Sequence, residues 1–341
     1  MAASAVPAGN PCSAGRRADL MTDEVDIKEN ELLSEHPEVL RLLLLDQTTH
    51  KNIFWATDSY AELGDGYQWG DPITVEHITG ERGDTIQPRS VKSREVQSQR
   101  SKDMAEVFTP SWVCNAQNNL ADEKWFGRSN VFNHESEDHT WTPTDGKIEF
   151  PKGRWKTWRR YVELNVLEVS CGEGPYLVSR YDTVTGEFIP VGKRIGLLDR
   201  KLRIVSENAS DMEEWLTWAK NAFRATYAFE WQGDSLMLAR EAAFRTFIDY
   251  YSARFGELPP EKDMNETAEI ISWNLWQMDG LRGVVPGSCH LEKEKDLFDP
   301  EKPCRGCKDG NIRHHNGSYC LIRDWKCPVR KEKRFVDLIR R

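Results

Sequence analysis

Units of strand, turn and helix follow one another through the middle of the chain, and this arrangement most limits the folds open to it. Val162–Val169 is a mostly apolar strand candidate that ends at a glycine-bearing turn, and Tyr227–Phe229 is a short strand followed by a helix from Ser235 to about Phe255. A further helix at about Asp263–Ile271 leads into the strand candidate Ser272–Met278. Strands that alternate with helices form parallel sheets with helical crossovers. The sequence therefore predicts an α/β fold.

The chain is long enough for two domains, because its 341 residues exceed the roughly 150 of a typical domain. Residues 1–20 are rich in Ala, Gly, Ser and Pro, and we expect them to form a disordered extension. Helical patterning followed by short strand candidates predicts an N-terminal α+β region over residues 21–100. The strand and helix units predict an α/β domain over residues 101–285, and a cysteine-rich module with a basic tail follows over residues 286–341.

The composition excludes several classes of protein. Hydrophobic residues make up 39% of the chain and charged residues 30%, a globular balance that excludes a wholly disordered or fibrous protein. The formal net charge of −9 argues against a protein that coats nucleic acid by bulk charge, although it is compatible with a local basic face. No apolar run approaches the roughly 18 residues of a membrane span, and Pro7, Gly9, Asn10 and Pro11 interrupt any secretory signal. We therefore expect a cytoplasmic protein with no membrane partner.

The most informative segment is the glycine-bearing turn within Leu167–Leu177. An apolar strand with an acidic residue near its end, Glu168, runs into Gly172 and Gly174 before the next helix. The two glycines let the backbone pass close to a ligand, and the carboxylate of Glu168 can accept hydrogen bonds from a ligand amine or hydroxyl. The alternative is an ordinary turn between a strand and a helix.

This segment resembles the S-adenosylmethionine-binding motif of adenine-specific DNA methyltransferases, in the branch that contains the modification (M) subunits of restriction systems. Three further segments resemble motifs of that family in the matching order: Glu106–Pro110 resembles the segment that closes over the methionine part of the cofactor, Tyr227–Leu236 the second motif, and Asn274–Leu281 the third. In the family, the second motif binds the ribose hydroxyls through an acidic residue and the third contacts the adenine of the cofactor. The resemblance implies these cofactor-binding residues: Phe108, Thr109, Pro110, Glu168, Cys171, Gly172, Gly174, Glu230 and Asp279.

The resemblance covers roughly residues 100–285 and implies a Rossmann-like methyltransferase core with S-adenosylmethionine as cofactor. It also implies transfer of a methyl group to the exocyclic amine of adenine, with DNA and other restriction-modification subunits as partners. Each motif has a simpler interpretation. Phe108–Pro110 can be a strand end and a turn, Glu230 a surface carboxylate, Asp279 a turn residue, and Cys171 an inert buried thiol.

The catalytic segment of such enzymes has no counterpart here. The exocyclic amine of adenine is a poor nucleophile, and an Asn- or Asp-Pro-Pro-aromatic segment accepts its hydrogens and stacks on the flipped base. The only adjacent prolines, Pro259 and Pro260, precede the third motif, whereas Asn316 and Tyr319 have the right end residues and spacing without the prolines. A turn in a metal-bound hairpin is the other interpretation of Asn316 and Tyr319. Two functions therefore stay open: a DNA adenine methyltransferase, which we favour, and a catalytically degenerate cofactor- and DNA-binding subunit that needs a partner chain.

Five of the eight cysteines lie between residues 289 and 327, and a local cluster in a large reduced protein is typical of a metal site. Tetrahedral zinc takes four sulfur or nitrogen ligands. Our first choice of structural zinc ligands is Cys289, Cys304, Cys307 and Cys320, and the possible substitutes are Cys327, His290, His314 and His315. The alternative is a set of free thiols with an incidental Cys-x-x-Cys spacing.

Two basic stretches can contact phosphates: Lys152–Arg160, where cations alternate with tryptophans, and the tail from Arg323 to Arg341. Lys and Arg contact backbone phosphates in nucleic-acid complexes, and Trp stacks on bases. Solvated charge over buried tryptophans is an equally good interpretation of both stretches.

Overall fold

The predicted parallel sheet is present in the computed structural model, which describes residues 28–104, 109–153, 155–292, 301–327, 329 and 332–339. Its strands are β5 (Val166–Val169), β6 (Thr226–Glu230) and β7 (Leu275–Gln277). They lie in the order β5-β6-β7, and both neighbouring pairs are parallel. The mixed α/β class predicted from the sequence is therefore confirmed.

Two of the strands are shorter than the sequence predicts, because helices extend into the predicted strands. Residues 158–162 form α6 (Trp158–Val162), so β5 begins only at Val166. Helix α10 runs on to Asn274, whose side-chain amide donates hydrogen bonds to the carbonyls of Phe223 (2.9 Å) and Thr226 (3.0 Å). These two bonds fix the point at which the helix gives way to β7.

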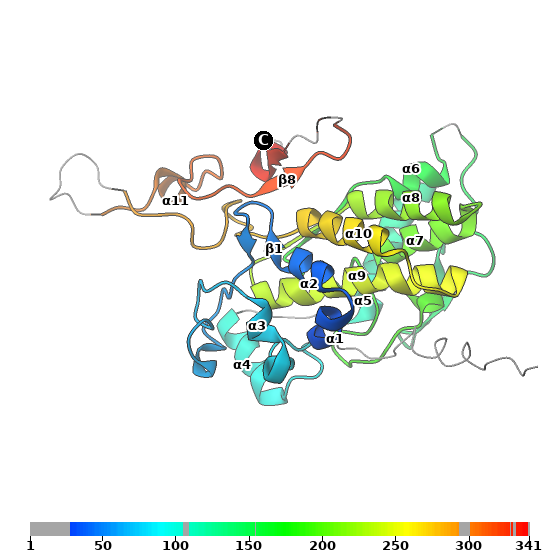
Figure 1. Cartoon of the computed structure of the whole chain (residues 1–341). Helices are drawn as coiled ribbons and strands as arrows, with labels where there is room; N and C mark the ends of the chain where they lie inside the picture. The colour runs from blue at the N-terminus through cyan, green and yellow to red at the C-terminus, as the bar shows by residue number, and fades with distance from the viewer. Residues whose placement is uncertain are drawn as a thin grey trace, which may run out of the picture.

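Four helices pack against one another and on the sheet, and they are the green-to-yellow ribbons at the right of Figure 1. They are α7 (Leu197–Asn208), α8 (Met212–Arg224), α9 (Gly233–Phe255) and α10 (Glu261–Asn274). Helix α8 begins after Asp211, whose carboxylate accepts a hydrogen bond from the Glu214 N–H at 2.8 Å and so caps the helix. Helix α9 is buried along most of its length, as a helix surrounded by other elements must be.

The N-terminal region shares its core with these helices. Its elements are α1 (Glu29–Glu35), α2 (Pro37–Leu44), β1 (Leu45–Asp46), β2 (Lys51–Asn52), η2 (Ala61–Leu63), α3 (Val75–Ile78), η3 (Gly80–Arg82) and α4 (Arg94–Met104). Helix α2 packs on α10, and its buried leucines join the main hydrophobic cluster. The buried guanidinium of Arg240 donates to the carbonyls of Leu43 (2.6 Å) and Leu275 (2.7 Å) and thereby ties α9 to both α2 and β7.

The remaining elements lie before the sheet, between its first two strands, and after it. They are α5 (Ser111–Phe126), β3 (Asn133–Glu135), β4 (Trp141–Pro143), η4 (Val191–Lys193), α11 (Arg305–Asp309), β8 (Leu321–Arg323), β9 (Glu332–Arg334) and η5 (Phe335–Asp337). In Figure 1, α11 lies at the end of the molecule opposite α6. None of the described helices is long and apolar enough to cross a lipid bilayer.

One face of the sheet carries Phe229 and Trp276, and the C-terminal module covers only part of this second face. Phe229 and Trp276 pack there in a small cluster with Cys320 and its neighbours. At β5, in contrast, the side chains of Leu167 and Val169 are 43% and 62% exposed. The sheet is therefore open to solvent along β5, close to the carboxyl ends of its strands.

Candidate cofactor pocket and metal centre

The turn after β5 has the backbone conformation that its glycines predict. The φ angles of Ser170, Gly172 and Gly174 are 50°, 54° and 76°, in the left-handed region that glycine adopts at little cost. The amide of Cys171 donates to the carbonyl of Phe229 at 3.0 Å, so the turn begins beside the end of β6. The glycines thus fold the chain back over the carboxyl edge of the sheet.

Glu168 binds the backbone that follows this turn. Its carboxylate accepts hydrogen bonds from the amides of Tyr176 (3.3 Å) and Leu177 (3.1 Å), and its side chain is buried. Burial raises the pKa of Glu168 to about 8, although the two backbone hydrogen bonds lower it. Glu168 therefore holds the loop that follows the glycines, and the role predicted for it at a ligand is not needed to explain its place.

Glu230 stands at the end of β6 and joins the two strand ends. Its Oε2 accepts a hydrogen bond from the Gly172 amide at 2.8 Å, and its Oε1 accepts from the amides of Trp231 (2.8 Å) and Gln232 (3.1 Å). Burial raises the pKa of this carboxyl, and the three hydrogen bonds oppose the shift. Glu230 is therefore a buried carboxylate at the position that the sequence predicts, rather than a surface one.

Asp279 closes the loop after β7. Its Oδ1 accepts hydrogen bonds from the amides of Leu281 (3.0 Å) and Arg282 (3.1 Å), and its own amide donates to the Val284 carbonyl at 2.8 Å. Asp279 is buried and stabilises a turn, as the simpler interpretation of the sequence holds.

A pocket of about 460 Å³ opens where the three strands end. It is lined by Val169, Ser170, Phe229, Trp231, Met278, Asp279, Gly280, Leu281 and Arg282. In open α/β sheets, ligands bind outside the carboxyl ends of the strands, and the volume lies within the range of about 300–1,000 Å³ typical of small-molecule sites. Among the predicted cofactor residues that the structure describes, only Asp279 lines this pocket. Glu230 lies in the chain between the lining residues Phe229 and Trp231, and the Gly172 amide donates to its carboxylate.

The upstream segment of the resemblance lies elsewhere. Phe108 is outside the described residues. The carbonyl of Thr109 accepts a hydrogen bond from the Thr183 hydroxyl at 3.2 Å, and Pro110 precedes the first residue of α5. Neither residue is among those that line the pocket. Cys171 is buried, and burial raises the pKa of its thiol well above its usual range, so the thiol stays protonated and inert at neutral pH.

A second and larger cavity was not predicted from the sequence. It has a volume of about 1,330 Å³ and lies between the N-terminal region and the turn that follows Glu230. The residues that line it are Ala56, Thr57, Asp58, Ser59, Tyr60, Glu62, Trp69, Thr85, Gln87, Val91, Lys92, Ser93, Val96, Arg100, Lys102, Trp231 and Gln232. They come from three stretches of the chain that share no motif. Only one of these stretches has a distinctive composition in the sequence, the basic segment from Arg89 to Lys102.

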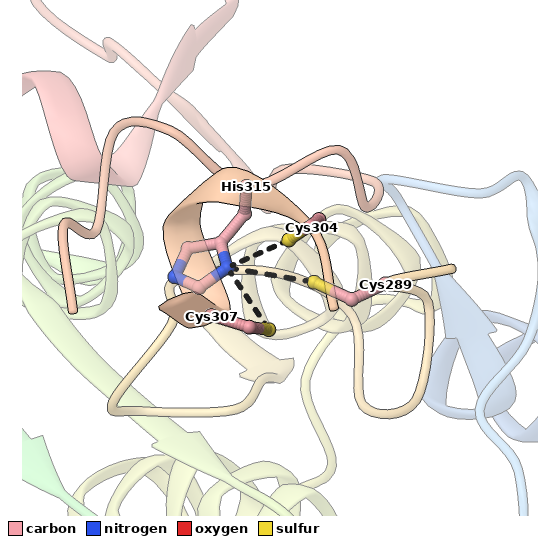
Figure 2. Close-up of side chains that lie close together, drawn as sticks. All are labelled: Cys289, Cys304, Cys307 and His315. Atoms are coloured by element: carbon pink, nitrogen blue, oxygen red, sulfur yellow. Dashed lines mark hydrogen bonds between the residues drawn. The ribbon is translucent and has the colours of Figure 1, made fainter. Parts of the chain in front are cut away.

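The cysteine cluster forms a compact group of possible metal ligands. The ligand atoms of Cys289, Cys304, Cys307 and His315 all lie within 4.8 Å of one another. Figure 2 shows the three sulfur atoms around Nδ1 of His315. The distances from Nδ1 to Sγ are 3.6 Å for Cys289, 3.7 Å for Cys304 and 3.6 Å for Cys307. A tetrahedral zinc ion with bonds of about 2.3 Å to sulfur and about 2.0 Å to nitrogen requires sulfur–nitrogen separations of about 3.5 Å. These four residues can therefore hold a metal ion.

The structure corrects the fourth ligand. Cys320 is fully buried in the small cluster on the second face of the sheet, with its sulfur 3.4 Å from the carbonyl oxygen of Gln277. It directly precedes β8, which directs its side chain toward the sheet, and His315 takes the place that we expected Cys320 to hold. His315 was one of the substitutes that the sequence allowed.

Asn316 and Tyr319 support the metal loop. The Asn316 amide group bonds to the backbone of His290 in both directions, at 3.1 and 3.0 Å, and the Tyr319 hydroxyl accepts a hydrogen bond from the His315 amide at 2.9 Å. Neither side chain is among those that line either cavity. Their positions agree with a turn in a metal-bound segment, the alternative to a catalytic role.

The basic stretches have structural partners. The guanidinium of Arg159 lies over the rings of Trp158 and Trp218 and forms an ion pair with Glu214 at 2.7 Å. Trp155 is 68% exposed, under the guanidinium of Arg160. Helix α6 enters β5 at its amino end, whereas the pocket opens at the carboxyl ends of the strands.

In the described part of the tail, cations also meet acidic groups. Arg323 pairs with Glu269, Lys333 with Asp324 and Arg334 with Asp337, at 2.7, 2.7 and 2.9 Å. These pairs favour the solvated, structural interpretation of the tail.

Comparisons of the chain with protein-family models, curated proteins and solved structures found no significant match.

Proposed function

We propose that this protein is an S-adenosylmethionine- and DNA-binding subunit of an adenine-specific DNA methyltransferase, and that a partner chain supplies the groups that activate the adenine amine. The observation that carries this proposal is the pocket of about 460 Å³ at the carboxyl ends of three parallel strands. Beside it, the amide of Gly172 meets the carboxylate of Glu230. The resemblance of the glycine turn and of the two following strand ends to the methyltransferase motifs supports the choice of ligand.

The residues at the pocket suit this cofactor. The sheet has its strands in sequential order, as in one half of a doubly wound Rossmann sheet. A carboxylate has about four lone-pair positions, and Glu230 uses three of them on backbone amides, so one is left for a ribose hydroxyl. Trp231 and Phe229 add aromatic walls, suited to a purine ring. S-adenosylmethionine supplies an electrophilic methyl group on a sulfonium centre when it is bound.

Adenine activation by a partner chain has a chemical reason. The adenine amine needs two hydrogen-bond acceptors to become a nucleophile, and the sequence has no Asn-Pro-Pro or Asp-Pro-Pro segment. The weak candidates Asn316 and Tyr319 form hydrogen bonds within the metal loop. A complete methyltransferase that acts alone is the competing function, and methyl transfer by the purified chain separates the two.

We also propose that the metal of the Cys289, Cys304, Cys307 and His315 group is zinc and that it is structural. Three thiolates and one imidazole suit zinc, and four protein ligands leave no open position for substrate. The part of the C-terminal module around them holds few buried apolar side chains, so metal binding would stabilise its fold.

Calorimetric titration of the metal-loaded protein with S-adenosylmethionine tests the cofactor site. We expect saturable binding that Val169→Trp abolishes, because the added indole fills the pocket from an exposed position. Val184→Trp places the same side chain at an exposed position outside the pocket and should bind like the wild type. Absence of binding to the folded wild type, or equal binding by Val169→Trp, would overturn the proposal.

Transfer of labelled methyl groups to adenine-containing DNA tests the need for a partner. We expect no transfer by the purified chain and transfer once host extract or a co-purifying subunit is added. Transfer by the purified chain alone would favour the complete enzyme instead.

A further inference from the structure

The larger cavity combines features that a small-molecule cofactor does not require. At about 1,330 Å³ it exceeds the range of about 300–1,000 Å³ typical of small-molecule sites. Its walls come from residues 56–69, from residues 85–102 and from the turn at Trp231 and Gln232. A ligand that fills it is therefore longer than one nucleotide or spans the cavity as part of a chain.

Charged side chains of both signs line this cavity. Asp58 and Glu62 line it from the loop at η2, and Lys92, Arg100 and Lys102 line it from the wall formed by the segment that ends in α4. Arg100 forms a buried ion pair with Asp234 at 2.8 Å, which fixes the position of that wall. The two lysines bring ammonium groups on flexible stems, which suit contacts with phosphates along a strand. The carboxylates of Asp58 and Glu62 suit the amino groups of a base.

Trp69 offers a surface for stacking. Its side chain is 44% exposed in the cavity wall, and its ring meets the edge of the Phe54 ring at 6.0 Å between centroids. Gly287 packs directly on the indole, because a Cβ at that position would collide with it. The indole is thus held in place by Phe54 and Gly287 and still exposes part of its surface to the cavity.

Trp231 connects the cavity with the pocket at the strand ends, since it lines both. Its carbonyl accepts a hydrogen bond from the Gln277 amide at 2.9 Å, and the same amide donates to the Phe54 carbonyl at 2.9 Å. Gln277 therefore fixes the wall between the two spaces to the end of β7. A group bound in the cavity lies next to a ligand bound at the strand ends.

We propose that this cavity binds a single strand of DNA, with a base that carries an exocyclic amine stacked on Trp69, its amine toward Asp58 and Glu62, and its phosphates against Lys92 and Lys102. The inference deepens the proposed function, on which it rests, by naming where the DNA strand lies. Aromatic stacking combined with lysine contacts is the general mode of single-strand recognition. The adjoining pocket explains why the strand would bind at this place rather than along the basic stretch at α6.

Fluorescence anisotropy with a labelled oligodeoxyadenylate and the full, metal-loaded chain tests the proposal. We expect Trp69→Ala to weaken binding about tenfold or more, and Trp69→Phe to retain most of it. Lys92→Glu/Lys102→Glu should weaken binding at least as much and reduce its salt dependence. The control Lys51→Glu/Lys262→Glu changes the net charge equally at exposed positions outside the cavity and should bind like the wild type.

A comparison of two oligonucleotides tests the expected preference for a base with an exocyclic amine. Oligodeoxythymidylate lacks an exocyclic amine and should bind more weakly than oligodeoxyadenylate, a difference that Asp58→Asn/Glu62→Gln should remove. Wild-type affinity in the Trp69→Ala and lysine variants, or no binding by the wild type, would overturn the proposal. Calorimetry with S-adenosylmethionine on the same samples separates the two inferences: retained cofactor binding with no strand binding rejects only the DNA site, and the reverse result rejects only the cofactor pocket.

Discussion

The amide of Gly172 donates a hydrogen bond to the carboxylate of Glu230 at 2.8 Å and joins two strand ends that are 58 residues apart in the chain. Glu230 accepts two further bonds from the amides of Trp231 and Gln232. A single carboxylate therefore satisfies three backbone donors at the carboxyl edge of the sheet. It shapes the rim of the pocket whether or not a ligand is bound there.

Substitution of Glu230 by Ala should destabilise the protein. The side chain is buried, and each buried amide left without an acceptor costs about 1–3 kcal/mol. Water entering the space left by the side chain would satisfy some of these amides, so we expect the free energy of unfolding to fall by about 1–3 kcal/mol in total. Urea denaturation measures it, and Glu213→Ala, at an exposed position of α8, should change little. A neutral Glu230→Ala would show that these amides find other acceptors.

Much of this fold follows from sequence patterns, since the parallel strands and their helices lie close to where alternating units predict them. In the sheet and its helices the errors fall at element ends, whereas Ile73–Ile78, a strand candidate in the sequence, contains the helix α3 (Val75–Ile78). Asn274 continues α10 because its side chain finds carbonyls of Phe223 and Thr226, which are close only in the folded chain. Sequence periodicity carries no information about such partners.

The site was less predictable, for two physical reasons. Cys320 and His315 both follow the Cys-x-x-Cys pair at spacings that suit a metal ligand. Only the burial of Cys320 against the sheet shows that His315 belongs to the metal group. The large cavity joins Trp69, Lys92 and Trp231, which no motif connects. Local spacing predicted the compact metal group but not a surface assembled from distant segments.

Lys201 should make a contribution to stability that rises with pH above pH 7. This ammonium is buried, with the carbonyls of Leu164 and Ala225 as acceptors, and burial lowers its pKa from 10.5 to about 7. Between pH 7 and 10.5 the unfolded chain holds a proton that the folded chain has lost, so raising the pH favours folding by up to about 1.4 kcal/mol per unit.

A matched variant isolates this effect from the titration of other buried groups. Glu168 acts in the opposite sense between pH 4.5 and 8, where the folded chain holds the extra proton, and its contribution levels off above pH 8. Burial also raises the pKa values of the Cys114, Cys171 and Cys320 thiols, so above about pH 8.5 these groups lower stability as the pH rises. Lys201→Met keeps all of these groups, so urea denaturation should show the wild type gaining stability relative to Lys201→Met as the pH rises from about 7 to about 9.5. An identical pH dependence in the wild type and in Lys201→Met would contradict the assignment.

Metal analysis of single variants should distinguish His315 from Cys320 as the fourth ligand. Loss of a residue that only hydrogen-bonds to a metal ligand lowers metal affinity about 10–100-fold. We expect His315→Ala and Cys304→Ala, which remove a ligand itself, to lower it further. Cys320→Ser should keep the metal, although a hydroxyl in the apolar cluster should lower the free energy of unfolding by about 1–3 kcal/mol. Cys327→Ser serves as the control for thiol removal. Metal loss in Cys320→Ser with retention in His315→Ala would restore the four-cysteine site.

Gly306 should be essential to the metal group although it contributes no ligand. It lies between Cys304 and Cys307 in α11, and the Cβ that alanine would add falls 2.5 Å from the backbone nitrogen of His315. Backbone does not yield as a flexible side chain would, so Gly306→Ala must push the His315 segment away from the sulfur atoms. We expect metal affinity to fall about 10–100-fold, as for other residues that position ligands. Competition with a chromogenic chelator measures it, and Gly192→Ala, at a position with no atom within 4 Å of the added Cβ, should leave the affinity unchanged.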